Sequence, residues 1–205
     1  MNGARNGPIS VYIDNNVWDF LFDRNIDLSV ELPREEFCIC LTREAEFEIP
    51  PMPADKRAFV EEMVRACGVR TDAYFGFFDE TLPSHEQRVA GFDQGRFATP
   101  EEVAFLAQQR TPIGGKKRPS GLYKNEADAS IAARAMARRF ASIVLSLDKD
   151  RGPINRAYQQ GAGSSFSTNL MPLVCRSAII SDSLFSVMSG SVVNCIGGGN
   201  VFRRG

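Results

Sequence analysis

The chain has 205 residues, of which 43% are hydrophobic, and a formal net charge of −1; this is enough apolar sequence for one sizeable core, and it excludes a uniformly basic, nucleic-acid-binding chain. Its five cysteines form no C-x₂-C pair and their odd number argues against a complete disulfide framework, so reduced thiols in an intracellular protein are expected. The N-terminus lacks a signal-peptide stretch and no apolar run is long enough to span a bilayer, so we expect a cytoplasmic chain with no membrane partner.

Strands and helices are expected to alternate along the chain. In chain order, we predict a buried strand at 9–13, a helix from 17, a buried strand at 37–41, helices at 42–49, 55–67, 100–106 and 125–140, and a strand at 143–147. Asn15 and Asn16 are expected to cap the first helix, and Gly68 to close the helix at 55–67. Thr99–Glu102 has the spacing of a capping box. The alternation predicts an α/β fold, a three-layer α/β/α arrangement around a central, mainly parallel sheet.

The stretch at 70–124 has a less regular pattern. It contains an aromatic cluster at Phe75–Phe78, which we expect to lie in the core, with stacking on single-stranded bases as the alternative. It also contains the most concentrated positive charge of the chain, a loop with Lys116, Lys117 and Arg118, which we call the basic loop. The basic loop either binds a phosphate backbone or is an ordinary solvated loop.

The composition changes near residue 163. Residues 1–163 are predicted to form one domain, enlarged over 68–123. Residues 164–205 hold only four charged side chains, many serines and several apolar pairs, and they form a C-terminal extension whose role the composition does not assign. An edge strand, an interface and a poorly ordered tail all remain open for this extension.

Four acidic residues stand where a sheet protein would need them for a shared site. Asp14 and Asp148 end the first and last predicted strands, while Glu44 and Asp128 open helices. Such positions can converge at one edge of a parallel sheet, and carboxylates that crowd together are stabilised by a hard cation such as Mg²⁺ or Mn²⁺. Taken singly, each acid also has an ordinary interpretation as a helix cap, a turn residue or a first-turn helix acid.

The sequence around these acids resembles the PIN domain family of metal-dependent nucleases, the fold shared by many bacterial toxin ribonucleases. The matching segments, between about residues 9 and 160, are VYIDNNVWDFL, LTREAEFEIPPMP, NEADASIAARA and IVLSLDKD. They select Asp14, Glu44, Asp128 and Asp148 as catalytic and metal-binding residues. The chain is longer than compact toxin members of the family, mainly over 68–123 and after 163.

The resemblance implies an endonuclease that uses one or two Mg²⁺ or Mn²⁺ ions. Its expected substrate is single-stranded RNA, whose phosphodiesters would be cleaved by a metal-activated water. Nothing in the composition separates RNA from DNA. The family also implies a cognate antitoxin or a homodimer as possible partners, and a toxin is a narrower form of the same prediction.

Three further features bear on substrate binding, and one leaves open which glutamate is the second acid. Ser146 precedes Asp148 by two residues, so both are expected on one face of the strand, with the hydroxyl near a phosphate or a metal water. Asn125 is either a helix cap, which we favour, or a substrate contact. If the basic loop contacts the substrate, Lys116, Lys117 and Arg118 would hold its phosphate backbone. Glu48 lies one helical turn after Glu44, so either glutamate can be the second acid.

Two other functions stay open at this stage. A PIN-like domain can act as a catalytically weak scaffold or regulatory binding protein, with the C-terminal extension as its interface. A phosphatase or receiver with an acid at the sheet edge is the other alternative, but the Asp-x-Asp of such phosphatases is replaced here by Asp14–Asn15–Asn16. The single histidine, His85, has no partner at a ligand spacing, and no nucleophile-elbow motif is present.

Overall fold

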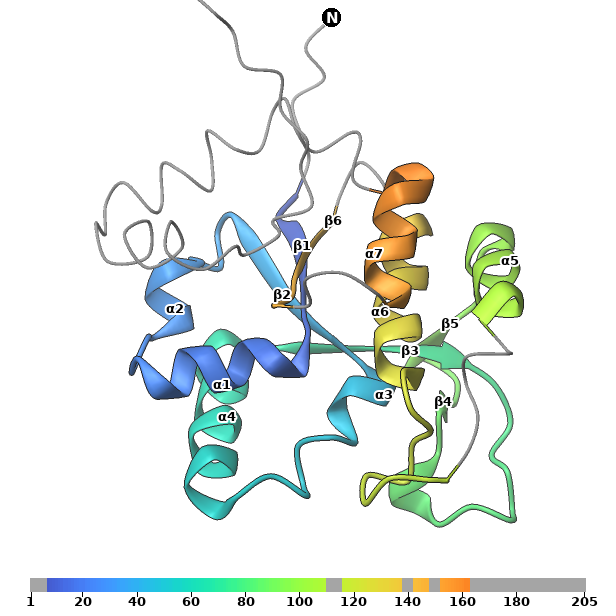
Figure 1. Ribbon diagram of the computed structural model, residues 1–205, viewed down its shortest axis with the longest axis horizontal. Coiled ribbons are helices and arrows are strands. Elements are labelled where there is room, and N and C mark those ends of the chain that lie inside the picture. Colours follow the sequence, from blue (N-terminus) through green and yellow to red (C-terminus); the bar gives the residue numbers. More distant parts are fainter. Residues whose placement is uncertain (1–6, 110–115, 138–141, 148–151, 163–205) are drawn as a thin grey trace, which may run out of the picture.

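The computed structural model describes residues 7–109, 116–137, 142–147 and 152–162 (Figure 1). Its centre is a parallel sheet with the strand order β4–β3–β2–β1–β6, in which β5 also pairs with β3. The strands are β1 (Ile9–Ile13), β2 (Phe37–Thr42), β3 (Arg70–Phe75), β4 (Val89–Ala90), β5 (Gly95–Arg96) and β6 (Ser142–Leu145).

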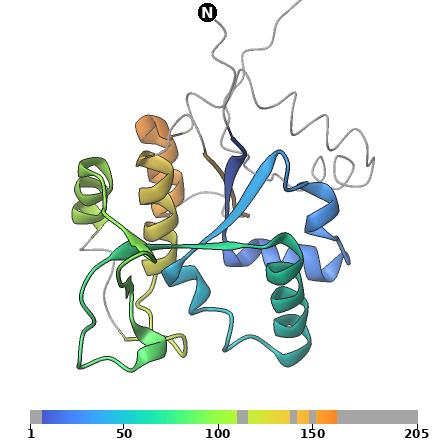
Figure 2. The same cartoon turned by 180° about the vertical axis from the view of Figure 1, so that it is seen from behind.

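Helices cover both faces of this sheet. One layer contains α1 (Asn15–Asp23), α2 (Leu28–Glu31) and α4 (Ala54–Cys67), and the other contains α5 (Pro100–Gln109), α6 (Glu126–Ala137) and α7 (Pro153–Ala157) (Figures 1 and 2). The short helix α3 (Arg43–Glu46) follows β2 and packs on α6. The remaining turns are η1 (Ser84–Glu86) and η2 (Tyr158–Ala162). The predicted three-layer α/β/α fold with a mainly parallel sheet is therefore confirmed.

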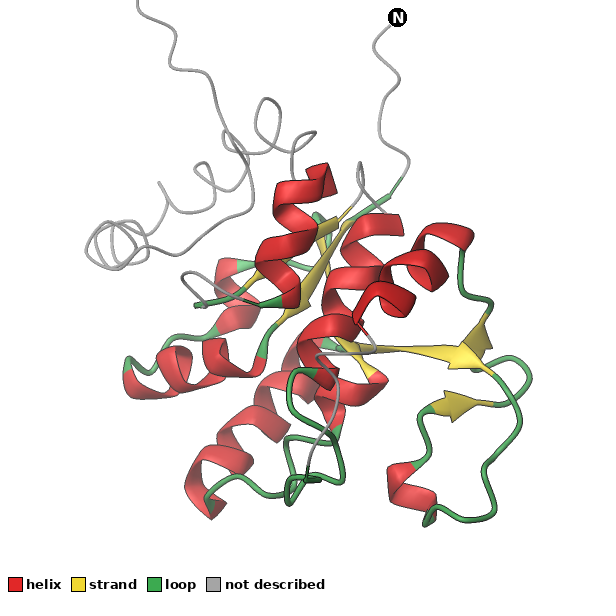
Figure 3. Cartoon of the chain, turned by 45° about the vertical axis from the view of Figure 1, so that its right-hand side comes forward, coloured by secondary structure: helices red, strands yellow, loops and turns green. Residues whose placement is uncertain are grey.

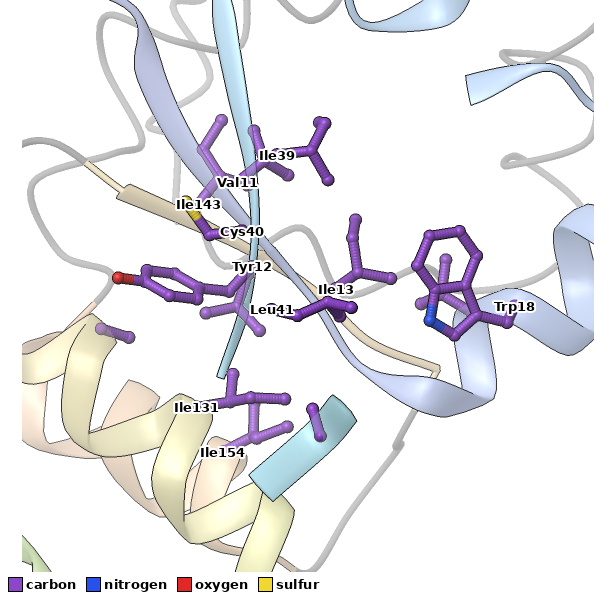
Figure 4. Close-up of a cluster of buried hydrophobic side chains, with 14 of the residues drawn as sticks. Val11, Tyr12, Ile13, Trp18, Ile39, Cys40, Leu41, Ile131, Ile143 and Ile154 are labelled. Carbon is purple, nitrogen blue, oxygen red and sulfur yellow. The ribbon is translucent and has the colours of Figure 1, made fainter. Parts of the chain in front are cut away.

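β1 is buried along its whole length because helices cover both faces of the sheet. The parallel register places Val11 beside Ile39 and Ile143, and the next residue, Tyr12, beside Cys40 and Val144. Successive side chains point to opposite faces, so these two rows belong to the two halves of the core. Figure 4 shows Val11, Tyr12, Ile39, Cys40 and Ile143 in this core, together with Ile131 from α6 and Ile154 from α7.

Most predicted elements occur where the pattern placed them. The strands β1, β2 and β6 and the helices α1, α4, α5 and α6 are present, and Thr99 and Glu102 form the predicted capping box. The Glu102 carboxylate accepts a hydrogen bond from the Thr99 backbone N–H at 2.8 Å, and the Thr99 hydroxyl accepts one from the Glu102 N–H at 3.3 Å. The pattern did not resolve β3, β4 and β5. β4 and β5 have two residues each, which is too few for a period, and the six residues of β3 begin with the exposed polar pair Arg70 and Thr71 and not with an apolar run.

The aromatic cluster was placed wrongly. Phe77 and Phe78 are 87% and 65% exposed, so they lie on the surface and not in the core. Figure 3 shows where the chain after β3 leaves the sheet and returns through β4 and β5 at its edge. Both residues follow the end of β3 at Phe75 and lie outside the strands of the sheet.

The described cysteines, Cys38, Cys40 and Cys67, carry free thiols, as predicted for a reduced protein. Burial raises the pKa of the Cys40 thiol to about 12 and that of the Cys67 thiol to about 11. Cys175 and Cys195 lie outside the described residues. Within the described ranges, no helix combines the length and the hydropathy that a membrane crossing requires.

The C-terminus of α4 depends on a glycine, as predicted. Gly68 has φ +57°, and its N–H donates to the Arg65 carbonyl at 3.1 Å. The Arg34 guanidinium donates to the Ala66 carbonyl at 2.5 Å and would lie 2.9 Å from a Cβ atom on residue 68. Only glycine adopts this left-handed conformation without strain, and here a side chain would also displace the guanidinium.

We expect Gly68→Ala to lower the free energy of unfolding by about 1–2 kcal/mol, because alanine is strained at this φ. Gly91→Ala is the matched control, since nothing lies within 4 Å of a Cβ atom built at Gly91. Urea unfolding followed by circular dichroism measures both. Equal stability of the two variants would contradict the assignment of strain to residue 68.

Candidate active site

The carboxyl edge of the sheet contains a point where the strand order reverses. From β1 the chain moves outward through β2 and β3 to β4, and it later returns to β6 on the other side of β1. In open α/β sheets, ligands bind outside the carboxyl ends of the strands at such a reversal. Here it lies between the ends of β1 and β6, where Asp14 and Ser146 are found.

Asp14 is 4% exposed and is bound to β6 by both its backbone and its side chain. Its N–H donates to the Leu145 carbonyl at 3.0 Å, and its Oδ2 accepts a hydrogen bond from the Ser146 hydroxyl at 2.6 Å. Asp14 occupies the N-cap position of α1, but its side chain makes no capping hydrogen bond. The carboxylate is thus directed to the end of β6 and not to its own helix.

Asn15 and Asn16 do not cap α1, so this prediction was wrong. Asn15 is the first residue of α1, and its amide donates to the Glu48 carboxylate at 2.8 Å and to the Ala45 carbonyl at 3.1 Å. The Asn16 Oδ1 accepts from the Leu147 N–H at 2.9 Å. The two amides connect the start of α1 to the segments that contain Glu48 and Leu147. Their hydrogen bonds go to these distant residues and not to the backbone at the start of α1.

Glu44 and Glu48 have different environments. Glu44 is 8% exposed, its Oε2 accepts a hydrogen bond from the Ser130 hydroxyl at 2.5 Å, and it lies 3.6 Å from the Arg134 guanidinium. Glu48 instead receives Asn15 and lies 3.3 Å from the Arg118 guanidinium. Glu44 is therefore the more buried of the two and is paired with Arg134. Glu48 connects Asn15 with Arg118 of the basic loop.

The α6 start and the basic loop lie beside this edge. Asp128 is half-buried in the first turn of α6. Asn125 has φ +61°, and its carbonyl accepts the first hydrogen bond of α6, from the Ala129 N–H at 3.0 Å. The backbone of Asn125 therefore lies at the N-terminal cap of α6, the position that we favoured for this residue. Lys117 is paired with Glu86 at 3.3 Å.

The remaining predicted residues are described as follows. Lys116 is exposed. Asp148, the fourth predicted acid, lies outside the described residues, as does the C-terminal extension. In the described part of the chain, no three acidic, histidine or cysteine side chains are grouped closely enough to hold a metal. The structure thus brings Asp14 and Ser146 together and does not show all four predicted acids as one cluster.

A network of buried charges next to Glu44 was missed by sequence reasoning. Arg134 has no exposed surface and donates to the Asp72 carbonyl at 3.0 Å and to the Ser130 hydroxyl at 3.0 Å. Its guanidinium lies 3.9 Å from the centre of the Tyr74 ring. The only signal in the sequence was an arginine among the alanines of the predicted helix at 125–140.

The network continues across the sheet through a second arginine. Arg96 donates to Asp72 at 2.8 Å and to the fully buried Glu102 at 2.5 Å and 2.8 Å, and the Tyr12 hydroxyl donates to Asp72 at 2.6 Å. Burial alone would raise the pKa of the Asp72 carboxyl, but the hydrogen bonds from Arg96 and Tyr12 and the charge of Arg134 outweigh it, so this pKa lies below its usual value.

No model of a known protein family matches the chain, and neither do the curated proteins or the solved structures with which it was compared.

Removing one charge from the network is expected to be costly. Arg134→Met should lower the free energy of unfolding by about 3–5 kcal/mol, because the Glu44 carboxyl group would be left buried without its cationic partner. Thermal unfolding of this variant and of the control Arg65→Met, at an exposed position of α4, measures the difference. The double variant Glu44→Gln/Arg134→Met should recover part of the loss; no recovery would mean that packing, and not charge, sets the cost.

Asp72 should make stability depend on pH in the acid range. Since its pKa is lower in the folded protein, the unfolded chain takes up this proton at a higher pH. The stabilisation is present in full above the unfolded pKa of about 3.9 and is lost as the pH falls through the folded value. Urea unfolding between pH 6 and pH 3 should therefore show a smaller loss of stability in Asp72→Asn than in the unmodified protein or in Asp23→Asn, an exposed control. Parallel curves for all three would rule out this role of Asp72.

Proposed function

We propose that this protein is a Mg²⁺- or Mn²⁺-dependent endoribonuclease that cleaves single-stranded RNA, with a PIN-like site. One observation carries the proposal: the buried Asp14 carboxylate is held by the Ser146 hydroxyl where the strand order reverses. Asp148, the last acid of the sequence pattern, follows Ser146 by two residues. The choice of RNA rests on the resemblance of the sequence to that family.

The residues at this edge suit an oxygen-seeking cation. Asp14 offers a carboxylate, and the Oδ1 atom of Asn15 is buried with no hydrogen-bond partner among the described residues. A cation or its water shell would satisfy this oxygen. Asp14, Asp128 and Asp148, with Glu44 or Glu48, would hold the ion. When bound, the ion would act as a Lewis acid and offset negative charge at the scissile phosphate.

The side chains around the acids orient them and meet the phosphate backbone. The Ser146 hydroxyl holds Asp14 in one orientation, and Asn16 fixes the end of β6 through the Leu147 N–H. Arg118 and Lys117 of the basic loop are exposed and paired with glutamates, so an incoming phosphate can replace those carboxylates as their partner. Ser146 is thus a positioning residue in this proposal.

The two glutamates have distinct roles in the proposal. Glu44 already has a cationic partner, Arg134, and a hydroxyl donor, Ser130. Glu48 is half-buried and turned toward Asn15 and Arg118. We assign the second acid to Glu44, as the sequence register does, with Arg134 and Ser130 holding its orientation. Glu48 links the acid edge to the basic loop.

Cleavage of an end-labelled single-stranded RNA by the purified protein tests the proposal. With Mn²⁺ or Mg²⁺ we expect cleavage that EDTA abolishes, and a loss of about a hundredfold or more in Asp14→Asn and in Asp128→Asn, because each would remove a carboxylate from the cation site. Asp23→Asn, the same change at an exposed position of α1, is the control and should cleave at the unmodified rate.

The glutamate variants refine this experiment. Glu44→Gln should lose cleavage to the same extent as the aspartate variants. Glu48→Gln should keep most of the cleavage rate and bind RNA at least as tightly, because Arg118 loses a competing carboxylate. The reverse pattern would move the second acid to Glu48. Equal cleavage by all variants would identify a contaminating nuclease and sink the proposal.

The Glu44–Arg134 pair supports one alternative function. An acid that is already neutralised by a buried arginine gains less from a cation, which suits a PIN-like scaffold or regulatory binding domain. Titration calorimetry with Mn²⁺ separates the two functions. Heat of binding that Asp14→Asn removes supports the nuclease, whereas neither metal binding nor cleavage supports the scaffold.

A further inference from the structure

Four phenylalanine rings form an exposed cluster on the edge of the sheet, which we call the phenylalanine patch: Phe75, Phe77, Phe92 and Phe97. Phe75, at the end of β3, is the centre, and its ring centroid lies 4.9 Å from Phe92, 5.2 Å from Phe97 and 6.3 Å from Phe77. The three outer rings are 79–87% exposed. They are gathered from β3 and the segments around β4 and β5 (Figure 3).

The phenylalanine patch exposes a large, continuous aromatic surface. A phenylalanine side chain buries about 150–250 Å² when it is covered, so the three outer rings together expose roughly 500 Å². That is the size of the largest apolar patches on single proteins, which commonly mark contact surfaces. The patch therefore calls for a partner with apolar side chains.

The charge around the patch is acidic. Between residues 76 and 101 there are five acids, Asp79, Glu80, Glu86, Asp93 and Glu101, and two arginines. Both arginines are already paired, Arg88 with Glu126 and Arg96 with Asp72 and Glu102. Of the five acids, Glu86 is paired with Lys117. Asp79 and Asp93, which directly follow Phe78 and Phe92, are exposed. An acidic rim repels a phosphate backbone and attracts a basic, apolar segment.

The chain itself contains such a segment. Residues 164–205 hold three arginines, Arg176, Arg203 and Arg204, and one acid, Asp182, so their net charge is +2. They are rich in leucine, isoleucine, valine and phenylalanine. Their composition is complementary to the patch in both charge and hydrophobicity.

The described chain ends close enough for this segment to reach the patch. In η2, Gln160 donates to Gln108 near the end of α5 at 3.4 Å. α5 rises about 1.5 Å per residue, so about 12 Å separate Gln108 from Pro100, and Phe97 lies three residues earlier. A fully extended chain covers about 3.3 Å per residue, so fewer than about ten residues span this path.

We propose that residues 164–205 dock on the phenylalanine patch of the same chain. Apolar side chains of the segment cover the rings, and its arginines meet the acidic rim. Tethering gives the segment an effective concentration in the millimolar range, which favours it over a second copy of the chain at ordinary protein concentrations. This inference does not depend on the nuclease activity.

Photo-crosslinking of the full-length protein tests the docking. With p-benzoylphenylalanine in place of Phe92, we expect irradiation to join position 92 to residues within 164–205 of the same chain, at a yield unchanged by tenfold dilution. The same probe at Val30, which is 70% exposed on α2, should not capture that segment. The proposal is overturned by crosslinks that join two chains and fade on dilution, by capture of added single-stranded RNA instead of the segment, by equal yield at both positions, or by no crosslink to 164–205.

A second measurement needs no probe. In Phe92→Ser/Phe97→Ser, trypsin should cut after Arg176 about tenfold faster than in the unmodified protein, because cleavage follows the fraction of undocked segment. The melting temperature should hardly change, since the two rings contribute little to the core. An unchanged cleavage rate would overturn the proposal.

Discussion

The Arg134 guanidinium is buried between α6 and the sheet, and the carboxylates of Glu44 and Asp72 lie on either side of it. Through these contacts one side chain joins three elements, α6, α3 and β3. The isolated charge would carry a desolvation cost of several kcal/mol, so the elements have to assemble together. The position of α6, and with it that of Asp128, follows from this requirement.

The same requirement shapes the candidate active site. Glu44, the proposed second acid, contacts Arg134 and accepts a hydrogen bond from Ser130, while Asp14 accepts one from Ser146 after the end of β6. Two carboxylates are thus held by different partners in a region of low exposure, where hydrogen bonds fix their directions. A site held in this way needs little rearrangement when a cation or phosphate arrives, which is the structural property expected of a preorganised catalytic centre.

Charged and apolar side chains are distributed unevenly over the surface of the molecule. The basic loop lies next to Glu48 at the carboxyl edge, whereas the phenylalanine patch lies beside acidic residues around β4 and β5. The two surfaces meet at Glu86, which belongs to the acidic rim of the patch and pairs with Lys117 of the basic loop. In the two proposals, the basic loop would contact the phosphate backbone and the C-terminal extension would cover the phenylalanine patch.

The sequence by itself determined the class of fold, the principal strands and helices, the close of α4 at Gly68 and the capping box at Thr99 and Glu102. These features depend on local period and backbone conformation, which neighbouring residues control. Only the tertiary structure decided that Asn15 and Asn16 bond to other segments, that Arg134 and Glu102 are buried, and that the phenylalanines are exposed. Each of these outcomes depends on which distant side chain satisfies a charge or covers a ring, and strand order, not local pattern, sets those neighbours.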